Sequence, residues 1–304
     1  MKTTLLLTAI RMRLAMRTRV FMFFSLIMPL AFLFLYAGIF AKSERNAVAY
    51  MLPAVLALTV MGSFWGMSMQ LVSFREQGIL RRFRLAPVGA GPLLASGILS
   101  NYLLTIPTIF IQLSIARWLF NVERFGNVLG VILLVSLGAM TFASMGLIVA
   151  SVTNSMQETQ VICNVVWFVL LFLTGATVPL PTLPLFVQRL ALFLPSTYLI
   201  TGLQQLLLNN AEVWQIGAEW LALSGCLLVS FFVSVQTFRW EQEEKIVGRA
   251  KLRAALAVIP FLLIGAYENA YGHRLEDARE AMRRVDKLQQ QQKQEQATPS
   301  SENK

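Results

Sequence analysis

The chain has 304 residues, of which 56% are hydrophobic and only 14% are charged, and its mean hydropathy is +0.60. These values lie outside the range of ordinary globular domains and indicate an integral membrane protein. The formal net charge of +10 does not indicate a nucleic-acid-binding protein, because the basic residues cluster beside apolar segments rather than along one soluble face.

Six apolar segments are long enough to cross a bilayer core, which needs about 20 residues in a helix. They cover residues 20–40, 53–72, 93–115, 128–150, 159–178 and 220–238. The run 190–211 is also uncharged, but Pro195 and several amide side chains dilute it. A helical hairpin partly sunk into the outer leaflet fits this run better than a full span. The sequence therefore predicts an all-α membrane protein with six transmembrane helices.

Lysine and arginine residues flank the six segments unevenly. The regions rich in them contain Lys2, Arg11, Arg13, Arg17 and Arg19, then Arg75, Arg81, Arg82 and Arg84, then Arg239, Lys245, Arg249, Lys251 and Arg253. The alternate loops hold fewer, and by the positive-inside rule the rich regions are cytoplasmic. We therefore expect a multi-pass protein of the inner membrane with both termini in the cytoplasm. The first segment resembles no cleaved signal sequence, so we expect it to be retained.

The segment before the first span has an apolar stripe formed by Leu7, Ile10 and Leu14, near Arg13 and Arg17. Such a pattern is typical of a helix that lies along the membrane surface. The sequence thus predicts an N-terminal interfacial helix.

A basic segment at residues 75–84 interrupts two long uncharged runs, 47–74 and 85–116. Gly78 allows a turn before it and Pro87 ends it. Ile79, Leu80 and Phe83 fall near one another on a short helix, and the arginines spread over the remainder. An apolar surface with basic flanks suits a groove on a partner protein. The alternative is that the arginines only anchor the loop at the lipid headgroups.

The short turn 151–157, between the fourth and fifth segments, is the second candidate for contact with a partner on the same side. Its polar residues are Ser151, Thr153 and Asn154. The polarity of any exposed turn would produce the same pattern, so this alternative stays open.

Four amide side chains lie inside predicted spans: Asn101, Gln112, Gln160 and Asn164. Polar groups in spans usually face protein or water, so these residues are candidates to line a substrate path. The alternative is that they form hydrogen bonds between helices.

Several kinds of chemistry are missing from the sequence. No span contains an Asp, Glu, Lys or Arg, which argues against a proton- or ion-coupled carrier. The single histidine, His273, lies in the tail, so we expect neither a catalytic residue nor a metal site in the membrane domain. No Gly-Lys dipeptide occurs, which excludes a phosphate-binding P-loop in this chain. Energy for uphill transport would have to enter through another subunit.

The tail, residues 241–304, differs in composition from the membrane domain at 1–240. Its stretch 254–267 has 14 uncharged residues, too few to span, and is predicted to be an interfacial or docked helix or, alternatively, a short re-entrant segment. The stretch 274–288 reads as an amphipathic helix, which would pair with a partner helix or pack on its own protein. Residues 289–304 are Gln-rich and predicted to be disordered.

Two motifs resemble those of ABC transporter permeases of the type 2 exporter fold. The first is FREQGILRRFRLAPVGAGPLL at 74–94, whose matching residues are Glu76, Gly78, Arg81, Arg82, Arg84 and Pro87. The second lies between the fifth and sixth spans, where the matching residues are Pro179, Leu183, Pro184, Leu194, Pro195, Tyr198 and Gly202. With the number of spans, the resemblance covers about residues 1–240.

The resemblance implies an ATP-driven exporter in which this chain is not itself an enzyme. It assigns Glu76, Gly78, Ile79, Leu80, Arg81, Arg82, Phe83, Arg84 and Pro87 to a cytoplasmic coupling helix that contacts a P-loop ATP-binding subunit. It also assigns Pro179, Pro184, Pro195 and Tyr198 to an extracellular re-entrant hairpin. Two permeases, as a homodimer or a heterodimer, would work with two ATPase copies carrying ATP and magnesium.

The absence of charges in the spans favours a hydrophobic or amphipathic cargo, such as a drug or lipid. A polysaccharide or haem exporter permease is the rival within transport, and a non-transporting membrane scaffold is the rival outside it.

Overall fold

The computed structural model describes residues 2–17, 27, 29–35, 38, 47–84, 89–120, 126–175, 180–241 and 259–272. Within these ranges the chain forms helices and turns and contains no strand. The predicted first span at 20–40 lies outside the described residues except for 27, 29–35 and 38. Pro87, Pro179 and the tail segments 242–258 and 273–304 also lie outside them.

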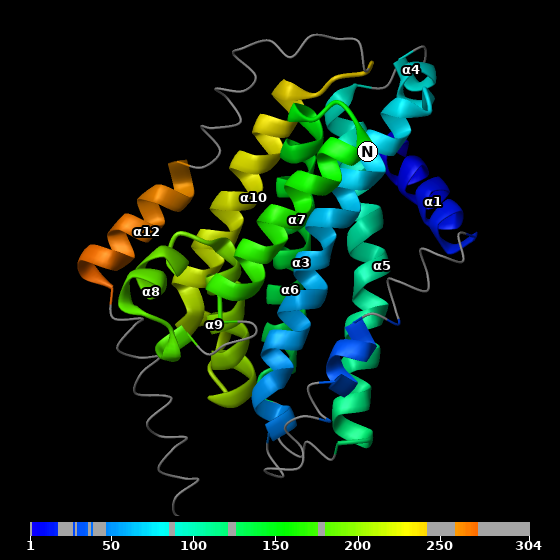
Figure 1. The fold of residues 1–304 in the computed structure, drawn as a ribbon. Helices are drawn as coiled ribbons and strands as arrows, with labels where there is room; N and C mark the ends of the chain where they lie inside the picture. The colour runs from blue at the N-terminus through cyan, green and yellow to red at the C-terminus, as the bar shows by residue number, and fades with distance from the viewer. Residues whose placement is uncertain are drawn as a thin grey trace, which may run out of the picture.

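Five long helices form the body of the molecule (Figure 1). They are α3 (Ala47–Glu76), α5 (Ala90–Trp118), α6 (Val128–Val152), α7 (Met156–Leu173) and α10 (Gly217–Thr237). All five are long and apolar enough to cross a membrane, and each overlaps a predicted span. α7 stops before the predicted end at residue 178 because Gly175, two residues beyond the helix, takes a positive φ of 84°. The all-α membrane architecture is confirmed for the described residues.

The helices run up and down between two ends of the bundle. At one end α3 leads into the short helix α4 (Ile79–Arg84), and α6 and α10 finish there as well (Figure 1). We call this the α4 end. At the other, the hairpin end, lie α8 (Leu185–Ala191) and α9 (Pro195–Leu208). The remaining short elements are the 3-10 helices η1 (Leu180–Thr182) and η2 (Val213–Ile216).

α6 is the central helix, and small residues let its neighbours approach closely. A side chain at Gly146 would collide with the carbonyl oxygen of Phe64 in α3. Next to this point the Ser68 hydroxyl donates to the Gly146 carbonyl at 2.9 Å. On the other side, Thr141 donates to the Leu223 carbonyl of α10 at 3.1 Å. Small side chains and hydroxyl bonds of this kind hold helices together where lipid replaces water.

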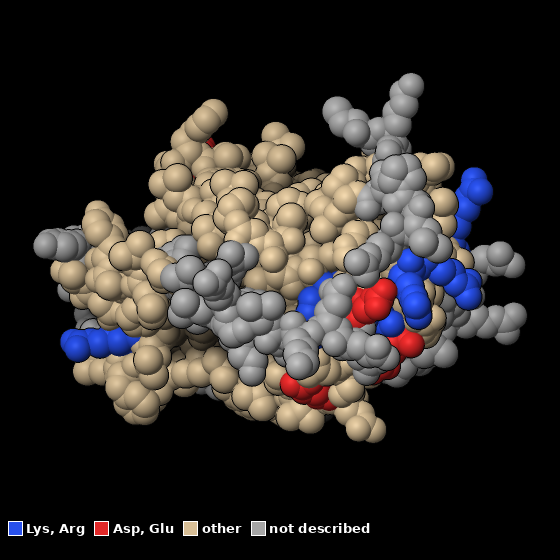
Figure 2. All heavy atoms as spheres, turned by 90° about the horizontal axis from the view of Figure 1, so that it is seen from above, with Lys and Arg blue, Asp and Glu red and all other residues tan. Residues whose placement is uncertain are grey.

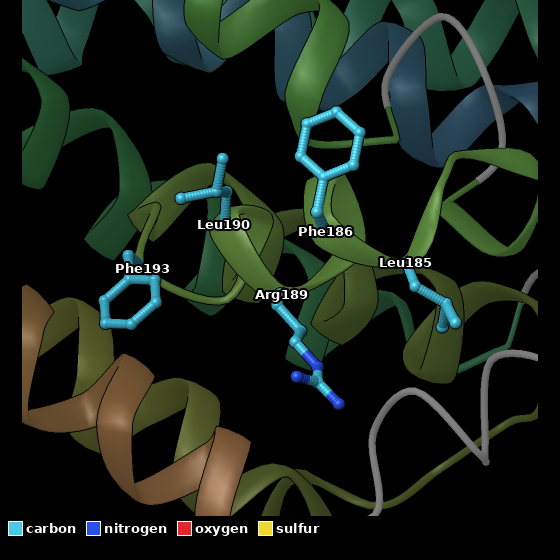
Figure 3. A pocket seen from close by; sticks show the side chains of 5 residues that line it. All are labelled: Leu185, Phe186, Arg189, Leu190 and Phe193. Atoms are coloured by element: carbon cyan, nitrogen blue, oxygen red, sulfur yellow. The ribbon is translucent and has the colours of Figure 1, made fainter.

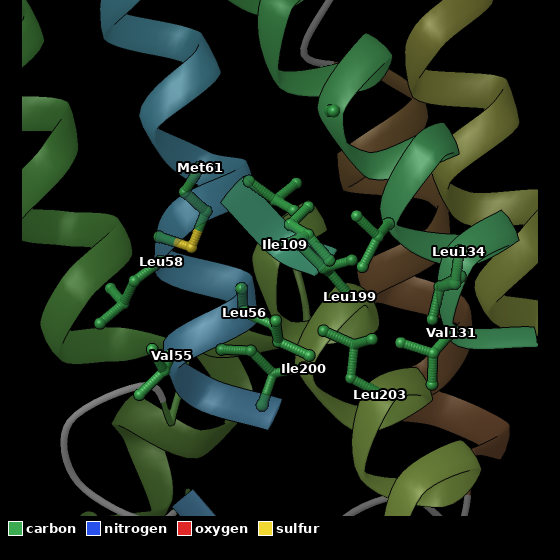
Figure 4. Close-up of a cluster of buried hydrophobic side chains, with 14 of the residues drawn as sticks. Val55, Leu56, Leu58, Met61, Ile109, Val131, Leu134, Leu199, Ile200 and Leu203 are labelled. Carbon is green, nitrogen blue, oxygen red and sulfur yellow. The ribbon is translucent and has the colours of Figure 1, made fainter. Parts of the chain in front are cut away.

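Buried apolar side chains form two clusters. The larger occupies the middle and the hairpin end, where Leu199, Ile200 and Leu203 of α9 meet side chains of α3, α5 and α6 (Figure 4). The smaller lies at the α4 end and includes Leu80 of α4. α9 therefore packs into the bundle as part of its core rather than lying on its surface.

α8 and α9 meet at an angle of 92°, so together they do not form a straight span. Pro184 lies just before α8, and Pro195 is the first residue of α9, where its missing N–H costs nothing. The Tyr198 hydroxyl donates to the Leu192 carbonyl at 2.9 Å across the bend. Side chains of α8 fan outward around a pocket of about 540 Å³ (Figure 3). Pro184, Pro195 and Tyr198 thus lie in or beside two short helices that meet at a sharp bend, and the re-entrant hairpin stays a prediction.

α1 (Lys2–Arg17) packs on α5 at the α4 end. Leu7 is buried in this contact, whereas Ile10 and Leu14 are exposed. The three residues lie on one side of the helix, as their spacing of three and four requires. Leu7 packs on protein and the other two face outward, so the interfacial role of α1 stays a prediction.

α12 (Ile259–Tyr271) lies against α10 and α8 (Figure 1). The Asn269 amide donates to the Arg189 carbonyl at 3.2 Å, and Gly265 leaves room for the Phe193 ring. Its contact with α8 brings α12 toward the hairpin end. The arrangement favours a docked or re-entrant helix over one lying on the surface of the α4 end.

Candidate functional site

The turn between α3 and α4 depends on Gly78. Its φ is +68°, a left-handed conformation that costs a non-glycine residue about 1–2 kcal/mol. The Gly78 N–H donates to the Arg75 carbonyl at 3.1 Å, which closes the end of α3. α4 then leaves α3 at a fixed angle. The sequence-based prediction of a turn at Gly78 is correct.

α4 presents different side chains to the protein and to solvent. Leu80 is fully buried in the cluster at the α4 end, and Phe83 is half-buried beside it. Arg81 and Arg82 are exposed. The sequence predicts that Leu80 belongs to an apolar surface for a partner, but in the structure Leu80 anchors α4 to its own chain. Ile79 and Phe83 are partly exposed and lie beside the arginines of α4.

Two buried arginines hold the last turn of α6. Arg75, at the end of α3, donates to the carbonyls of Ala150 at 2.9 Å and Thr153 at 2.6 Å. Arg239, just after α10, donates to the carbonyls of Ser151 at 3.1 Å and Thr153 at 2.6 Å. The final carbonyls of a helix have no partner within it and carry its negative end, so cations suit this position.

The start of α7 is held by acidic and hydroxyl groups. Glu76 accepts a hydrogen bond from the Met156 N–H at 2.8 Å. Ser155 accepts from the Glu158 N–H at 3.2 Å, and the Glu158 carboxylate accepts from the Asn154 N–H at 2.7 Å. Acceptors at a helix N-terminus satisfy its free N–H groups and its positive dipole. Adjacent residues of α3 thus bind the end of α6 and the start of α7.

The structure therefore brings the basic segment 75–84 and the turn 151–157 together as one site. Basic and acidic side chains lie beside one another on this face of the molecule (Figure 2). Ser151 and Thr153, predicted as partner contacts, are buried, and their carbonyls bind the arginines. Only Asn154 of that predicted trio is exposed. No group of three or more His, Cys, Asp or Glu suited to a metal ion occurs among the described residues.

The role of Arg239 could not be read from the sequence. In the sequence it is one of several basic residues that follow the last span. Besides its carbonyl partners it donates to the Asn154 side-chain oxygen at 3.0 Å. Arg239 is only 7% exposed, whereas an arginine that anchors the chain at lipid headgroups would be exposed. The available signal was its position immediately after a span, which many topological arginines share.

Comparison with known proteins identifies the family of this chain. The sequence pattern of ABC-2 family transporter proteins matches residues 41–235. This chain belongs to that family. A multi-pass permease of this kind is the membrane component of an ABC transporter, and the family generally works with an ATP-binding subunit.

Three relatives are permeases. The linearmycin resistance permease protein LnrN of Bacillus subtilis (strain 168) is 29% identical over 171 residues, 56% of this chain and 43% of LnrN. The putative transport permease YvfS of the same organism is 24% identical over 219 residues, 67% of this chain and 85% of YvfS. The daunorubicin resistance ABC transporter permease protein DrrB1 of Streptomyces coeruleorubidus is 26% identical over 230 residues, 70% of this chain and 77% of DrrB1. The match to LnrN thus spans less than half of that protein.

The four amides proposed for a substrate path have different surroundings in this ABC-2 permease. Gln112 is fully buried and donates to the Thr59 hydroxyl at 2.9 Å, which joins α5 to α3. This bond favours the alternative of hydrogen bonding between helices for Gln112. Asn101, which like Gln112 belongs to α5, lies beside Gly66 of α3. Gln160 is exposed and Asn164 is partly exposed, four residues apart on α7.

Arg11 of α1 is a buried cation near the α4 end. It is 7% exposed, stands 5.3 Å from the centre of the Phe74 ring and lies against Gly97 of α5. Its Nη2 has no hydrogen-bond partner. Burial without a carboxylate lowers the pKa of Arg11 to about 10. Arg11 thus fixes α1 to α3 and α5 at an electrostatic cost.

Proposed function

We propose that this ABC-2 permease exports a hydrophobic or amphipathic molecule across the plasma membrane and is driven by a separate ATP-binding subunit. The observation that carries the proposal is the joint at the α4 end. There an exposed basic helix, α4, is tied through Arg75 and Glu76 to the ends of α6 and α7. A partner that moves α4 would move these spans as well.

The orientation follows from charge. The α4 end carries Arg75, Arg239 and the basic residues of α1 and α4, so by the positive-inside rule it would face the cytoplasm. Both termini would then be cytoplasmic. The α8–α9 hairpin would re-enter the membrane from outside. The docking of α12 against α8 supports the re-entrant alternative for this part of the tail.

The ATPase would act from the cytoplasm. The sequence lacks a phosphate-binding P-loop, so ATP and magnesium would be held by the partner subunit. Arg81 and Arg82 are exposed for contact with it, with Ile79 and Phe83 beside them. Two copies of the ATPase and two permeases, identical or related, would complete the transporter.

The outward face of α7 is the proposed contact between permeases. Only 17% of its most apolar 18-residue stretch is buried within the chain, which is the lowest share among the five long helices. Gln160 and Asn164 lie on its half nearest the α4 end, and Phe168 and Phe172 stack at 6.2 Å toward the other end. A path along this face would offer polar and then aromatic surface to a cargo.

The relatives support a small-molecule cargo. Two of them are named for resistance to linearmycin and to daunorubicin. The apolar segments 53–72, 93–115, 128–150, 159–178 and 220–238 also lack charged residues that would neutralise a strongly ionic substrate. Polysaccharide or haem export remains the alternative within transport, and a scaffold that recruits partners through its tail is the alternative outside it.

Co-purification from membranes tests the proposal. The full chain should recover a P-loop ATPase, and Arg81→Glu with Arg82→Glu should abolish this association while leaving membrane insertion intact. A second variant, Arg82→Glu with Phe83→Asp, also removes an apolar side chain of the contact. Arg189→Glu on α8 is the matched control at the hairpin end. Undiminished ATPase binding by both α4 variants would contradict the coupling role. Loss of partners only when residues 254–304 are deleted would favour the scaffold.

A further inference from the structure

We propose that Arg239 is a positioning residue that makes α10 move together with α4 and the α6–α7 turn. The inference deepens the proposed function and rests on it. Arg239 joins the end of the last span to the Thr153 carbonyl, to which Arg75 also donates.

The first step is the geometry of the Arg239 guanidinium. It donates to two backbone carbonyls and to the Asn154 side chain, so all its nitrogens point at the α6–α7 turn. A planar guanidinium can bind several acceptors in fixed directions, which an ammonium group cannot. Arg239 therefore fixes both the position and the direction of the chain as it leaves α10.

The second step is the shared acceptor. Arg75 and Arg239 both donate to the Thr153 carbonyl at 2.6 Å, and Thr153 is fully buried. Two cations tolerate this proximity because the C-terminal carbonyls of α6 lie between them. Displacement of either arginine would leave carbonyls at the end of α6 without that donor. The ends of α3 and α10 are thus coupled through α6.

The third step is direct contact between the segment after α10 and α4. Glu241 lies 3.9 Å from Arg81 of α4, on a surface that is largely exposed. Phe238 and Trp240 meet edge to face at 4.9 Å and pack on the same cluster as Phe83 and Leu80. An exposed ion pair alone contributes little, so we assign the coupling to Arg239 and the packing around it.

These contacts define a functional role beyond stability. α10 also packs on α9 at the hairpin end. A displacement of α4 by an ATPase would therefore reach α9 through α10, in addition to α6 and α7. Without Arg239, the end of α10 would follow α4 only through the packing of α10 on α6.

Distance measurements between spin labels test this role. The buried Cys163 and Cys226 are replaced by alanine, and labels are placed at Gln77→Cys, exposed on the turn that leads into α4, and at Phe232→Cys on the exposed face of α10. We expect one narrow distance in the permease, unchanged when the ATPase complex is trapped with ATP and vanadate. In Arg239→Gln, the distribution of distances between the labels should broaden in the permease alone. In the trapped complex, the distance should change, because α10 no longer moves together with α4.

Two comparisons separate positioning from simple loss of structure. Arg239→Lys keeps the charge without the fork and should restore the narrow distance only in part, whereas Arg189→Gln should change nothing. ATPase co-purification should survive in Arg239→Gln because Arg81 and Arg82 are intact. A narrow, unchanged distance in Arg239→Gln would overturn the inference even if the ATPase binds. Failure of the unmodified chain to bind any ATPase would instead overturn the proposed function, and this inference with it.

Discussion

The carboxylate of Glu76, the last residue of α3, accepts a hydrogen bond of 2.8 Å from the backbone N–H of Met156, the first residue of α7. The two residues are 80 positions apart in the chain. Their contact joins the start of the α3–α4 turn to a span that exposes most of its surface. A force applied to α4 therefore has a short path to α7.

Substitution of Glu76 should weaken this path. Glu76→Ala removes an acceptor at the N-terminus of α7, and such losses cost about 0.5–2 kcal/mol, with the lower end expected for an exposed side chain. We expect a small fall in the thermal unfolding midpoint in detergent and a larger fall in cargo-stimulated ATP hydrolysis. Glu76→Gln keeps an acceptor oxygen and should lie between. Equal ATPase stimulation in Glu76→Ala and the unmodified chain would contradict the prediction.

The angle of α4 should depend on glycine at position 78. Because its φ is +68°, Gly78→Val should be more harmful than Gly78→Ala, and Gly78→Asn should be tolerated best. No side chain would collide there, since nothing lies within 4 Å of an added Cβ. Differences among the variants therefore report backbone conformation alone. Co-purification of the ATPase should follow the order Gly, Asn, Ala, Val.

The sequence predicted the positions of the long helices better than the contacts of individual side chains. Uncharged length located α3, α5, α6, α7 and α10, because crossing a bilayer requires it. It could not show that Leu80 is buried in its own chain or that Gln112 binds Thr59, because both depend on which helices are neighbours. The partners of Arg239 lie more than 80 residues away in sequence. Local pattern carries no information about such pairings.

Close packing of α3 and α6 should make Gly146 intolerant of any side chain. The added Cβ of Gly146→Ala would meet the Phe64 carbonyl, and because this is backbone, no rotamer change can relieve it. Overpacking costs about 1–3 kcal/mol or more. We expect Gly146→Ala to reduce the monodisperse fraction in size-exclusion chromatography. Gly62→Ala in α3, with nothing within 4 Å, is the matched control and should behave like the unmodified chain.

Removal of the Arg11 charge should stabilise the protein. A pKa lowered from 12.5 to about 10 corresponds to a penalty of about 3 kcal/mol on the charged form, more than the ~0.5–2 kcal/mol of a cation–π contact. The penalty is present at every pH below the lowered pKa and is relieved as the pH rises through about 10. Arg11→Met should therefore raise the unfolding midpoint at neutral pH. Arg11→Ala, which leaves space beside Gly97, should raise it less or lower it.

Amide substitutions should separate the structural role of Gln112 from the proposed path on α7. Gln112→Leu removes one bond between α5 and α3, and polar bonds between membrane helices contribute about 0.6 kcal/mol on average. Thr59 keeps its bond to the Val55 carbonyl at 3.0 Å, so no hydroxyl is left unsatisfied. We expect a slightly lower unfolding midpoint and an unchanged profile of drugs that stimulate ATP hydrolysis. Gln160→Ala and Asn164→Ala, at exposed and partly exposed positions, should leave the midpoint unchanged and alter that profile. The opposite assignment of effects would place the path inside the protomer, between α3 and α5, instead of along α7.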